Sequence, residues 1–374
     1  MRDSAERAAR WASTMKGHEA IGGVHFAHAD SWAGSGSNLL LPRTAREERE
    51  HATLATLATR SHDGGTRAID EPADPWRTCF ERDRDRILHA SAFRRLSGKT
   101  QVFVFPDDHQ RTRLTHALEV AQVAVSVARA LGLNVALTEA IALGHDCGHG
   151  PGGHASEDAL SPFVPGGFDH ATWGADVTLV PLNLCAETLD GIRNHSWSRP
   201  APGTPEGEVV SWADRIAYVC HDFEDAVASG VVREDQLPAL VRDRCGTVRR
   251  EQLGAFIYGM IDAAAETGRI GMTARQAEAL AAFRTFNYEN IYLRPASRDQ
   301  ARAVISLLRA LVEHYATNPQ QLPQAPEADP GSDAALHAAV AYVGGMTDRF
   351  ACRQGIALLD WPIDQLPKGI DTPV

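Results

Sequence analysis

The feature that most constrains this 374-residue chain is a stretch dense in histidines and carboxylates that begins at residue 113. Five histidines fall within 55 residues: His116, His145, His149, His154 and His170. His116, the adjacent pair His145–Asp146 and the later Asp214 together offer two imidazoles and two carboxylates. Such a set suits a divalent transition metal whose other coordination positions stay open for water and a phosphate oxygen. A single His-Asp pair is usually an exposed pair without a function, but ligands before and after it make that alternative weaker.

Helical periodicity places these residues on helix faces and at helix ends. Apolar residues recur at the spacing of one helix face over four segments: 114–131, 135–145, 208–228 and 300–315. The Gly-rich run 148–153 predicts that the second helix ends just after His145 and Asp146. Both side chains would then point from a helix C-terminus into a loop. Strand patterns are sparse throughout, so the sequence predicts an all-α fold.

Composition excludes some classes of partner. The net charge of −11 argues against a broad nucleic-acid surface, although it allows a local basic pocket for an anionic small molecule. The six cysteines show no CxxC spacing, which indicates reduced thiols rather than a disulfide scaffold or a zinc knuckle. No apolar run is long enough to span a membrane, and the N-terminus lacks the apolar segment of a signal peptide. We therefore expect a cytoplasmic protein without a membrane partner.

Pro75 suits a first helical position, which predicts a helix from Asp74. Six basic residues follow close together: Arg82, Arg84, Arg86, Arg94, Arg95 and Lys99. They form either a solvated basic face or a clamp for phosphates.

Helical spacing joins several candidate site residues. Arg113 lies three residues before His116, so a helix puts both side chains on one face. His154 and Glu157 have the same spacing, which brings an imidazole and a carboxylate within hydrogen-bond reach. Such a pair can move a proton, although Glu157 also suits a helix start. A spacing of four places a third set on one helical stripe: Asp214, Tyr218 and Asp222.

Blocks along the chain resemble those of a known family. They read FERDRDRILHASAFRRLSGKTQVF (80–103), RTRLTHALEVAQ (111–122), HDCGHGPGGHASEDAL (145–160), LNLCAETLDGI (182–192), ADRIAYVCHDFEDA (213–226), NIYLRP (290–295) and GMTDRF (345–350). On these blocks the chain resembles the HD-domain superfamily of metal-dependent phosphohydrolases, and within it the bacterial deoxyguanosinetriphosphate triphosphohydrolase-like proteins. The resemblance implies an all-α HD-domain core with an appended C-terminal helical region. Because the blocks begin only near residue 72, we expect residues 1–70 to be an N-terminal extension of unclear role. Residues 71–230 would form the HD core, and 231–374 would add helices that pack on it.

The resemblance also implies roles for individual residues. One divalent metal ion per subunit would be held by His116, His145, Asp146 and Asp214. Catalysis is implied for Asp146, with His154 and Glu157 at the scissile α-phosphate. Contacts to the substrate are implied for Gln101, Arg113, His149, His170, Tyr218 and Asp222. The sequence departs from the family after His170, where ATWGAD replaces an HNxQ pattern, and at Gly152, which replaces a usual phenylalanine.

The implied activity is hydrolysis of a deoxynucleoside triphosphate, dGTP or another, to a deoxynucleoside and tripolyphosphate. By the same resemblance we expect a homo-oligomer and a possible nucleotide activator. Two alternatives stay open: a phosphohydrolase for a nucleoside monophosphate or cyclic nucleotide, and a non-catalytic module that binds nucleotides or single-stranded nucleic acid. The ligand set suits Mn²⁺, Mg²⁺, Fe²⁺, Co²⁺, Ni²⁺ or Zn²⁺. We expect His195 to be structural and Arg294 to lie on a helix surface.

Overall fold

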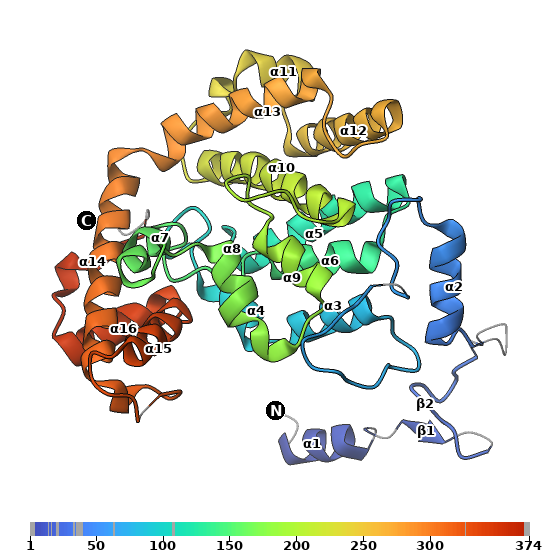
Figure 1. Ribbon diagram of the computed structural model, residues 1–374, viewed down its shortest axis with the longest axis horizontal. Coiled ribbons are helices and arrows are strands. Elements are labelled where there is room, and N and C mark those ends of the chain that lie inside the picture. The colour runs from blue at the N-terminus through green and yellow to red at the C-terminus, as the bar shows by residue number, and fades with distance from the viewer. Residues whose placement is uncertain are drawn as a thin grey trace. The chain divides into compact units, whose positions relative to one another are not determined.

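The computed structural model describes residues 4–13, 15, 17–19, 22–32, 34, 40–62, 64–106, 109–325 and 327–369 (Figure 1). The chain forms two compact units, 1–41 and 42–374. Among the described residues, strands are limited to one short antiparallel pair and helices make up the rest of the regular structure. The all-α prediction is confirmed. No helix in the described part of the chain is both long and apolar enough to cross a membrane.

The first unit is small and exposed. It contains helix α1 (Ser4–Ser13) and two strands, β1 (His18–Glu19) and β2 (His25–Phe26), which pair antiparallel. None of the α1 side chains is buried, and both strands are exposed along their length. Nothing in this unit forms a hydrophobic core among the described residues.

Four helices form the centre of the second unit: α3 (Cys79–His89), α5 (Arg113–Leu131), α6 (Val135–Gly144) and α10 (Pro205–Ala228) (Figure 1). The inward stripe predicted for α5 is buried, with Val120 and Ala124 fully enclosed. The helix ends at Gly132, whose φ of 67° lies in the left-handed region that glycine adopts readily. Asn134 then caps α6 by accepting the N–H of Leu137. These caps fix where the two helices end and begin.

The helix predicted to begin at Asp74 starts later, so that prediction is wrong. α3 begins at Cys79, after Thr78, whose hydroxyl accepts the N–H of Glu81 in a capping box. The carboxylate of Asp74 instead accepts the N–H groups of Trp76 and Arg77. Such local hydrogen bonds stabilise a turn in competition with a helix.

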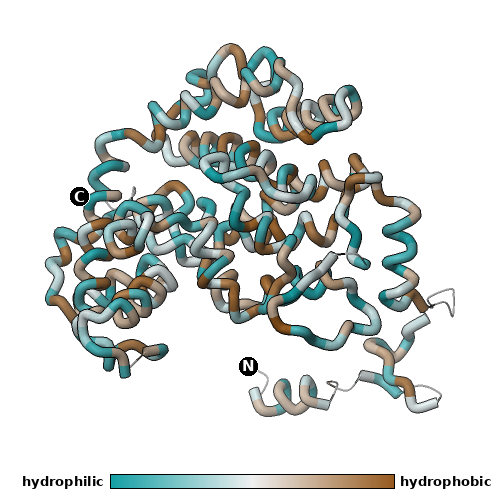
Figure 2. Tube along the Cα trace, viewed as in Figure 1, coloured by the Kyte–Doolittle hydropathy of each residue, from teal (hydrophilic) through white to brown (hydrophobic). Residues whose placement is uncertain are grey.

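The remaining helices surround this centre. Their bounds are α2 (Arg43–Thr53), α4 (Ser91–Arg95), α7 (Ala155–Leu160), α8 (His170–Trp173), α9 (Ala186–Arg193), α11 (Ala239–Cys245), α12 (Arg249–Thr267), α13 (Ala274–Asn287), α14 (Pro295–Thr317), α15 (Asp333–Gly344) and α16 (Asp348–Leu359). Helices α10 to α13 share the main hydrophobic core with α3, α5 and α6. Helices α7, α14, α15 and α16 build a second hydrophobic cluster. The hydropathy colours in Figure 2 alternate along these helices, as expected when one stripe of each helix is buried.

Residues 42–70 contact the core of this second unit. Thr59 donates its N–H and its hydroxyl to Glu206 of α10, at 3.0 and 2.8 Å. Arg67 forms a buried ion pair with Asp83 of α3 at 2.7 Å. The proposed boundaries at 70 and 230 stay predictions, and residues 370–374 of the third part lie outside the described residues.

Candidate functional site

Three helices bring the predicted metal ligands together. His116 comes from α5, His145 and Asp146 follow the last turn of α6, and Asp214 comes from α10. The Nε2 atom of His116 lies 3.0 Å from Asp214 Oδ1, and that of His145 lies 3.7 Å from the same oxygen. Asp146 approaches both imidazoles, at 3.5 Å from His145 and 4.0 Å from His116. The four side chains therefore converge on one small volume.

The donor atoms of this cluster fit a divalent cation. His145 Nδ1 donates to the carbonyl of Ala142 at 2.6 Å, which fixes the ring and turns Nε2 toward Asp146 and Asp214. That Nε2 atom is buried and has no hydrogen-bond partner among the described residues, yet it faces Asp146 and Asp214. Ligand atoms of His116, His145 and Asp214 all lie within 4.8 Å of one another. A positive ion between them would satisfy an otherwise orphaned imidazole nitrogen and two carboxylates.

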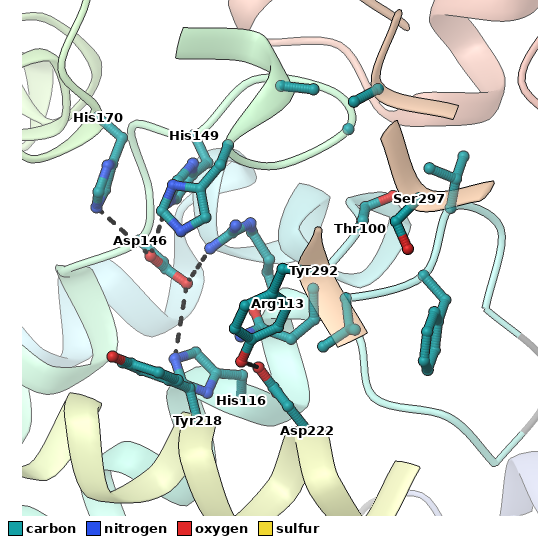
Figure 3. A pocket seen from close by; sticks show the side chains of 18 of the residues that line it. Thr100, Arg113, His116, Asp146, His149, His170, Tyr218, Asp222, Tyr292 and Ser297 are labelled. Atoms are coloured by element: carbon teal, nitrogen blue, oxygen red, sulfur yellow. Dashed lines mark hydrogen bonds and ion pairs between the residues drawn. The ribbon is translucent and has the colours of Figure 1, made fainter. Parts of the chain in front are cut away.

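The charges in this cluster of four side chains favour a bound cation. Burial alone would lower the pKa of His145, but Asp146 and Asp214 raise this pKa to about 9. Burial alone would raise the pKa of Asp146, yet Arg113 and the neighbouring imidazoles hold it well below its ordinary value. Arg113 donates to Asp146 at 2.7 Å (Figure 3). His116 and His145 likewise hold the pKa of Asp214 low against the effect of burial. Both carboxylates are therefore ionised at neutral pH.

A second group of histidines lies beside the cluster. Glu157 of α7 contacts His154 Nδ1 at 3.1 Å and His170 Nδ1 at 2.7 Å, so the contact expected from the His154–Glu157 spacing is present. The rings of His149 and His170 stack with centroids 3.7 Å apart, and His149 Nε2 lies 3.2 Å from Asp146. Burial opposes ionisation of Glu157, but hydrogen bonds to the two imidazoles lower its pKa. Burial and then Arg113 hold the pKa of His149 well below its ordinary value.

His195 joins this group, which the sequence did not predict. Its Nδ1 donates to the carbonyl of Ile192 at 2.8 Å, and its Nε2 lies 3.2 Å from His170 Nε2. Burial, followed by the nearby His145 and His170, lowers the pKa of His195 to about 4. His195 is therefore a neutral acceptor toward His170. It follows α9 in sequence and reaches the site only through the packing of that helix, so no local spacing indicates its position.

A pocket of about 430 Å³ opens beside the histidines. Of the predicted site residues, all except His145 and Glu157 line it: Gln101, Arg113, His116, Asp146, His149, His154, His170, Asp214, Tyr218 and Asp222. Tyr292 also lines the pocket and donates to Asp222 at 2.5 Å (Figure 3). Burial raises the pKa of Asp222 to about 8, although the hydrogen bond from Tyr292 lowers it. A cavity of this size accommodates a small organic ligand.

Three arginines from distant parts of the sequence line the pocket. Arg215 of α10 stacks over Trp197 at 3.7 Å, and Arg284 of α13 donates to Tyr218 at 2.8 Å. Arg294, which the sequence predicted on a helix surface, lines the pocket as well. Within the described part of the chain, none of these three guanidinium groups has a carboxylate within 4.0 Å. Guanidinium groups that line a pocket and have no carboxylate partner of their own suit an anionic ligand.

The basic run between residues 82 and 99 does not line the pocket. Arg82 and Arg86 both pair with Glu71 at 2.5 Å, and Arg84 pairs with Asp85 at 2.7 Å. None of the run's six basic side chains lines the pocket, so a direct phosphate clamp there is wrong. Neighbouring carboxylates neutralise the first three of them, a feature that local sequence did not indicate.

Comparisons with known proteins agree with this geometry. Residues 113–219 match the HD domain family, and residues 270–355 match the phosphohydrolase-associated domain. The chain is 39% identical to a deoxyguanosinetriphosphate triphosphohydrolase-like protein of Caldanaerobacter subterraneus subsp. tengcongensis, over 83% of this chain and 93% of that protein. A relative of the same name in Clostridium perfringens is also 39% identical, over 82% and 94%.

A third relative, deoxyguanosinetriphosphate triphosphohydrolase-like protein 1 of Deinococcus radiodurans, is 36% identical over 85% of this chain and its own full length. The matched HD segment contains all four residues of the metal cluster, and the second matched segment contributes Arg284 and Arg294 to the pocket. The chain therefore belongs to the deoxyguanosinetriphosphate triphosphohydrolase-like proteins of the HD-domain phosphohydrolase family.

Proposed function

We propose that this phosphohydrolase cleaves deoxynucleoside triphosphates into a deoxynucleoside and tripolyphosphate. One observation supports this proposal most strongly. The four-ligand metal cluster and three arginines without carboxylate partners line or adjoin the same pocket of about 430 Å³. A triphosphate carries about four negative charges, and guanidinium groups bind phosphate oxygens through paired hydrogen bonds. The names of the relatives point to the same class of substrate.

His116, His145, Asp146 and Asp214 would hold one divalent ion at the end of the pocket. When bound, that ion supplies charge stabilisation at a phosphate oxygen and lowers the pKa of water. Arg113 donates to Asp146 and lines the pocket, so it holds this carboxylate in place and faces the substrate. The choice among Mn²⁺, Mg²⁺, Fe²⁺, Co²⁺, Ni²⁺ and Zn²⁺ depends on availability as much as on these ligands.

His154 and Glu157 would provide the proton transfer. The His154 side chain is 74% exposed and lines the pocket. The Glu157 side chain is 26% exposed and contacts Nδ1 of that ring. This arrangement lets the carboxylate orient the imidazole while the other ring nitrogen faces the substrate. The imidazole would act at the α-phosphate, either on the attacking water or on the leaving 5′ oxygen. His149 and His170 would contact the phosphates.

Other residues that line the pocket would bind the nucleoside and the phosphates. We assign the nucleoside to Gln101, Tyr218 and Asp222. Arg215 and Arg284 would bind phosphate oxygens, because they line the same pocket and lack carboxylate partners among the described residues. We further propose a cytoplasmic homo-oligomer with a possible nucleotide activator. The acidic net charge of −11 argues against nucleic acid as the main partner.

Product analysis tests the proposed reaction. The purified protein is incubated with Mn²⁺ and each of the four deoxynucleoside triphosphates, alone and mixed, and with GTP. Anion-exchange chromatography should then reveal deoxynucleoside and tripolyphosphate, and Asp146→Ala should abolish both products. Monophosphate plus pyrophosphate would place the cleavage elsewhere. If no triphosphate is cleaved, the same incubation is repeated with nucleoside monophosphates and cyclic nucleotides. Turnover of these alone would favour a different phosphohydrolase activity, and binding without turnover would favour a non-catalytic module.

A further inference from the structure

The Gly-rich loop 148–153 is held by residues that the proposed reaction does not use. Asp348, the first residue of α16, lies in the GMTDRF block and is 5% exposed. Its Oδ1 accepts the N–H of Gly152 at 2.9 Å, and its Oδ2 accepts the N–H and the hydroxyl of Thr100 at 2.9 and 2.5 Å. One buried carboxylate thus joins the loop, the segment before Gln101 and the C-terminal helices.

A second buried side chain holds the other end of the loop. The ammonium of Lys99 donates to the carbonyl of His149 and, at 2.9 Å, to the carbonyl of Gly344 at the end of α15. Lys99 is 2% exposed, and no carboxylate among the described residues lies within 4.0 Å of it. Lys99 and Asp348 therefore connect both ends of the loop to the junction between α15 and α16.

Ser156 holds the middle of the loop, because its hydroxyl accepts the N–H of Gly150 at 3.0 Å and donates to the carbonyl of Gly153 at 2.6 Å. Gly152 has a φ of 74°, and a Cβ on it would lie 2.5 Å from Val304 of α14. Gly153 has a φ of 63°, and a Cβ there would lie 2.8 Å from a guanidinium nitrogen of Arg113. A side chain at either position would be strained or would clash, so the loop is held there by hydrogen bonds to its backbone. His149 lies within this loop and His154 follows it directly, so the placement of both side chains depends on the loop.

We propose that Asp348 is a positioning residue, which holds loop 148–153 and Thr100 so that His149, His154 and Gln101 face the substrate. This inference rests on the proposed function, because it assigns the C-terminal helical region a part in the same reaction. Asp348 does not line the pocket, and so it acts only through the backbone groups that it accepts. A displacement of about 1 Å at a reacting group can cost roughly a hundredfold in rate.

Asp348→Asn tests the proposal, because it keeps the shape and replaces one acceptor oxygen by an NH₂ group. That group would face the N–H of Gly152 or of Thr100, which forces the loop to shift. We expect kcat per metal-loaded enzyme to fall about tenfold to a hundredfold with the metal content unchanged. In a His154→Ala background, the part of the loss that comes from misplacing His154 should disappear, so the same substitution should lower kcat by a smaller factor than in the wild type.

Glu206→Gln is the matched control. Glu206 is also a buried carboxylate that accepts two backbone N–H groups and one threonine hydroxyl, from Thr59 and Asn134. It does not line the pocket or contact the loop. We expect Glu206→Gln to lower thermal stability while kcat per folded, metal-loaded enzyme stays within about twofold of wild type.

Amide hydrogen exchange of the metal-loaded, full-length protein separates this inference from the proposed function. Asp348→Asn should accelerate exchange in the peptide covering 148–154, and Glu206→Gln should not. Unchanged exchange in that peptide would overturn the proposal, as would accelerated exchange with unchanged kcat. If the wild type hydrolyses no triphosphate, the proposed function fails, and the exchange result alone decides whether Asp348 holds the loop. Should Asp348→Asn fail to fold, Thr100→Val removes only the hydroxyl donor, and the same two readouts apply.

Discussion

At the residue scale, the site is defined by a buried imidazole nitrogen that has no hydrogen-bond partner in the described part of the chain and by the carboxylates that it faces. His145 Nε2 is buried, without a hydrogen-bond partner among the described residues, and faces two ionised carboxylates. The convergence of His116, His145, Asp146 and Asp214 was expected from the adjacent His-Asp pair at a helix end and from the resemblance to the HD family. Their role as metal ligands stays a prediction. Arg284 and Tyr292 could not be predicted, because they reach the pocket from α13 and the turn after it, and single arginines or tyrosines carry no local signature.

Metal binding should release a proton. The carboxylates raise the pKa of His145 to about 9 without a metal, and a coordinating imidazole must be neutral. Below pH 9 the ion therefore displaces that proton, so affinity should rise about tenfold per pH unit from 7 to 8 and level off above 9. Calorimetry of Mn²⁺ binding at pH 7.5 in two buffers of different ionisation enthalpy should report about one proton released. Equal heats in both buffers would contradict this expectation.

Arg215 should matter for binding more than for chemistry. A hydrogen bond between charged groups contributes about 1.5–3 kcal/mol, which corresponds to roughly tenfold to a hundredfold in affinity. We expect Arg215→Ala to raise KM for a deoxynucleoside triphosphate by that factor with a smaller effect on kcat. Arg193→Ala is the control, because Arg193 pairs with Asp176 and does not line the pocket. Steady-state kinetics would count against this role for Arg215 if both variants raised KM equally.

At the element scale, local sequence patterns predict the helices that hold the site. Two other predictions were wrong because nearby side chains form hydrogen bonds or ion pairs that the patterns do not indicate. Periodicity and the Gly-rich run located α5, α6 and α10 to within a few residues. The helix start expected at Asp74 was wrong, because the carboxylate of Asp74 accepts the N–H groups of Trp76 and Arg77 and so stabilises a turn. The basic run after Arg82 failed as a phosphate clamp because Glu71 and Asp85 pair with three of its arginines. Such pairings join segments whose contact the sequence does not specify.

The turn after α6 depends on close backbone approach to α8. A Cβ on Gly148 would lie 2.0 Å from the carbonyl oxygen of His170 and 2.4 Å from the nitrogen of Gly174, both backbone atoms. We expect Gly148→Ala to separate the loop from α8 and to lower kcat at least tenfold. Thermal unfolding should show a loss of about 1–3 kcal/mol, as for overpacked cores. Gly254→Ala on α12, where a Cβ meets only a ring atom at 4.0 Å, should leave both quantities near wild type.

At the scale of the whole molecule, the second unit contains every residue of the proposed site. The pocket is lined by residues from 100 to 368, and both matched domains lie in this range. The sequence predicted that a C-terminal helical region packs on the core, but its contribution to the pocket through Arg284, Tyr292 and Arg294 depends on tertiary contacts. A chain lacking residues 1–41 should therefore keep its metal content and its kcat within about twofold. A collapse of either quantity would show that the first unit supports the site.

The most direct test of the central claim is the fate of oxygen from water. The protein is loaded with Mn²⁺ and supplied with a deoxynucleoside triphosphate in H₂¹⁸O, and the products are measured by mass spectrometry. Attack of water at the α-phosphorus with release of the 5′ oxygen predicts one ¹⁸O atom in tripolyphosphate and none in the deoxynucleoside. Label in the deoxynucleoside, or in pyrophosphate or orthophosphate formed directly, would contradict the proposed reaction.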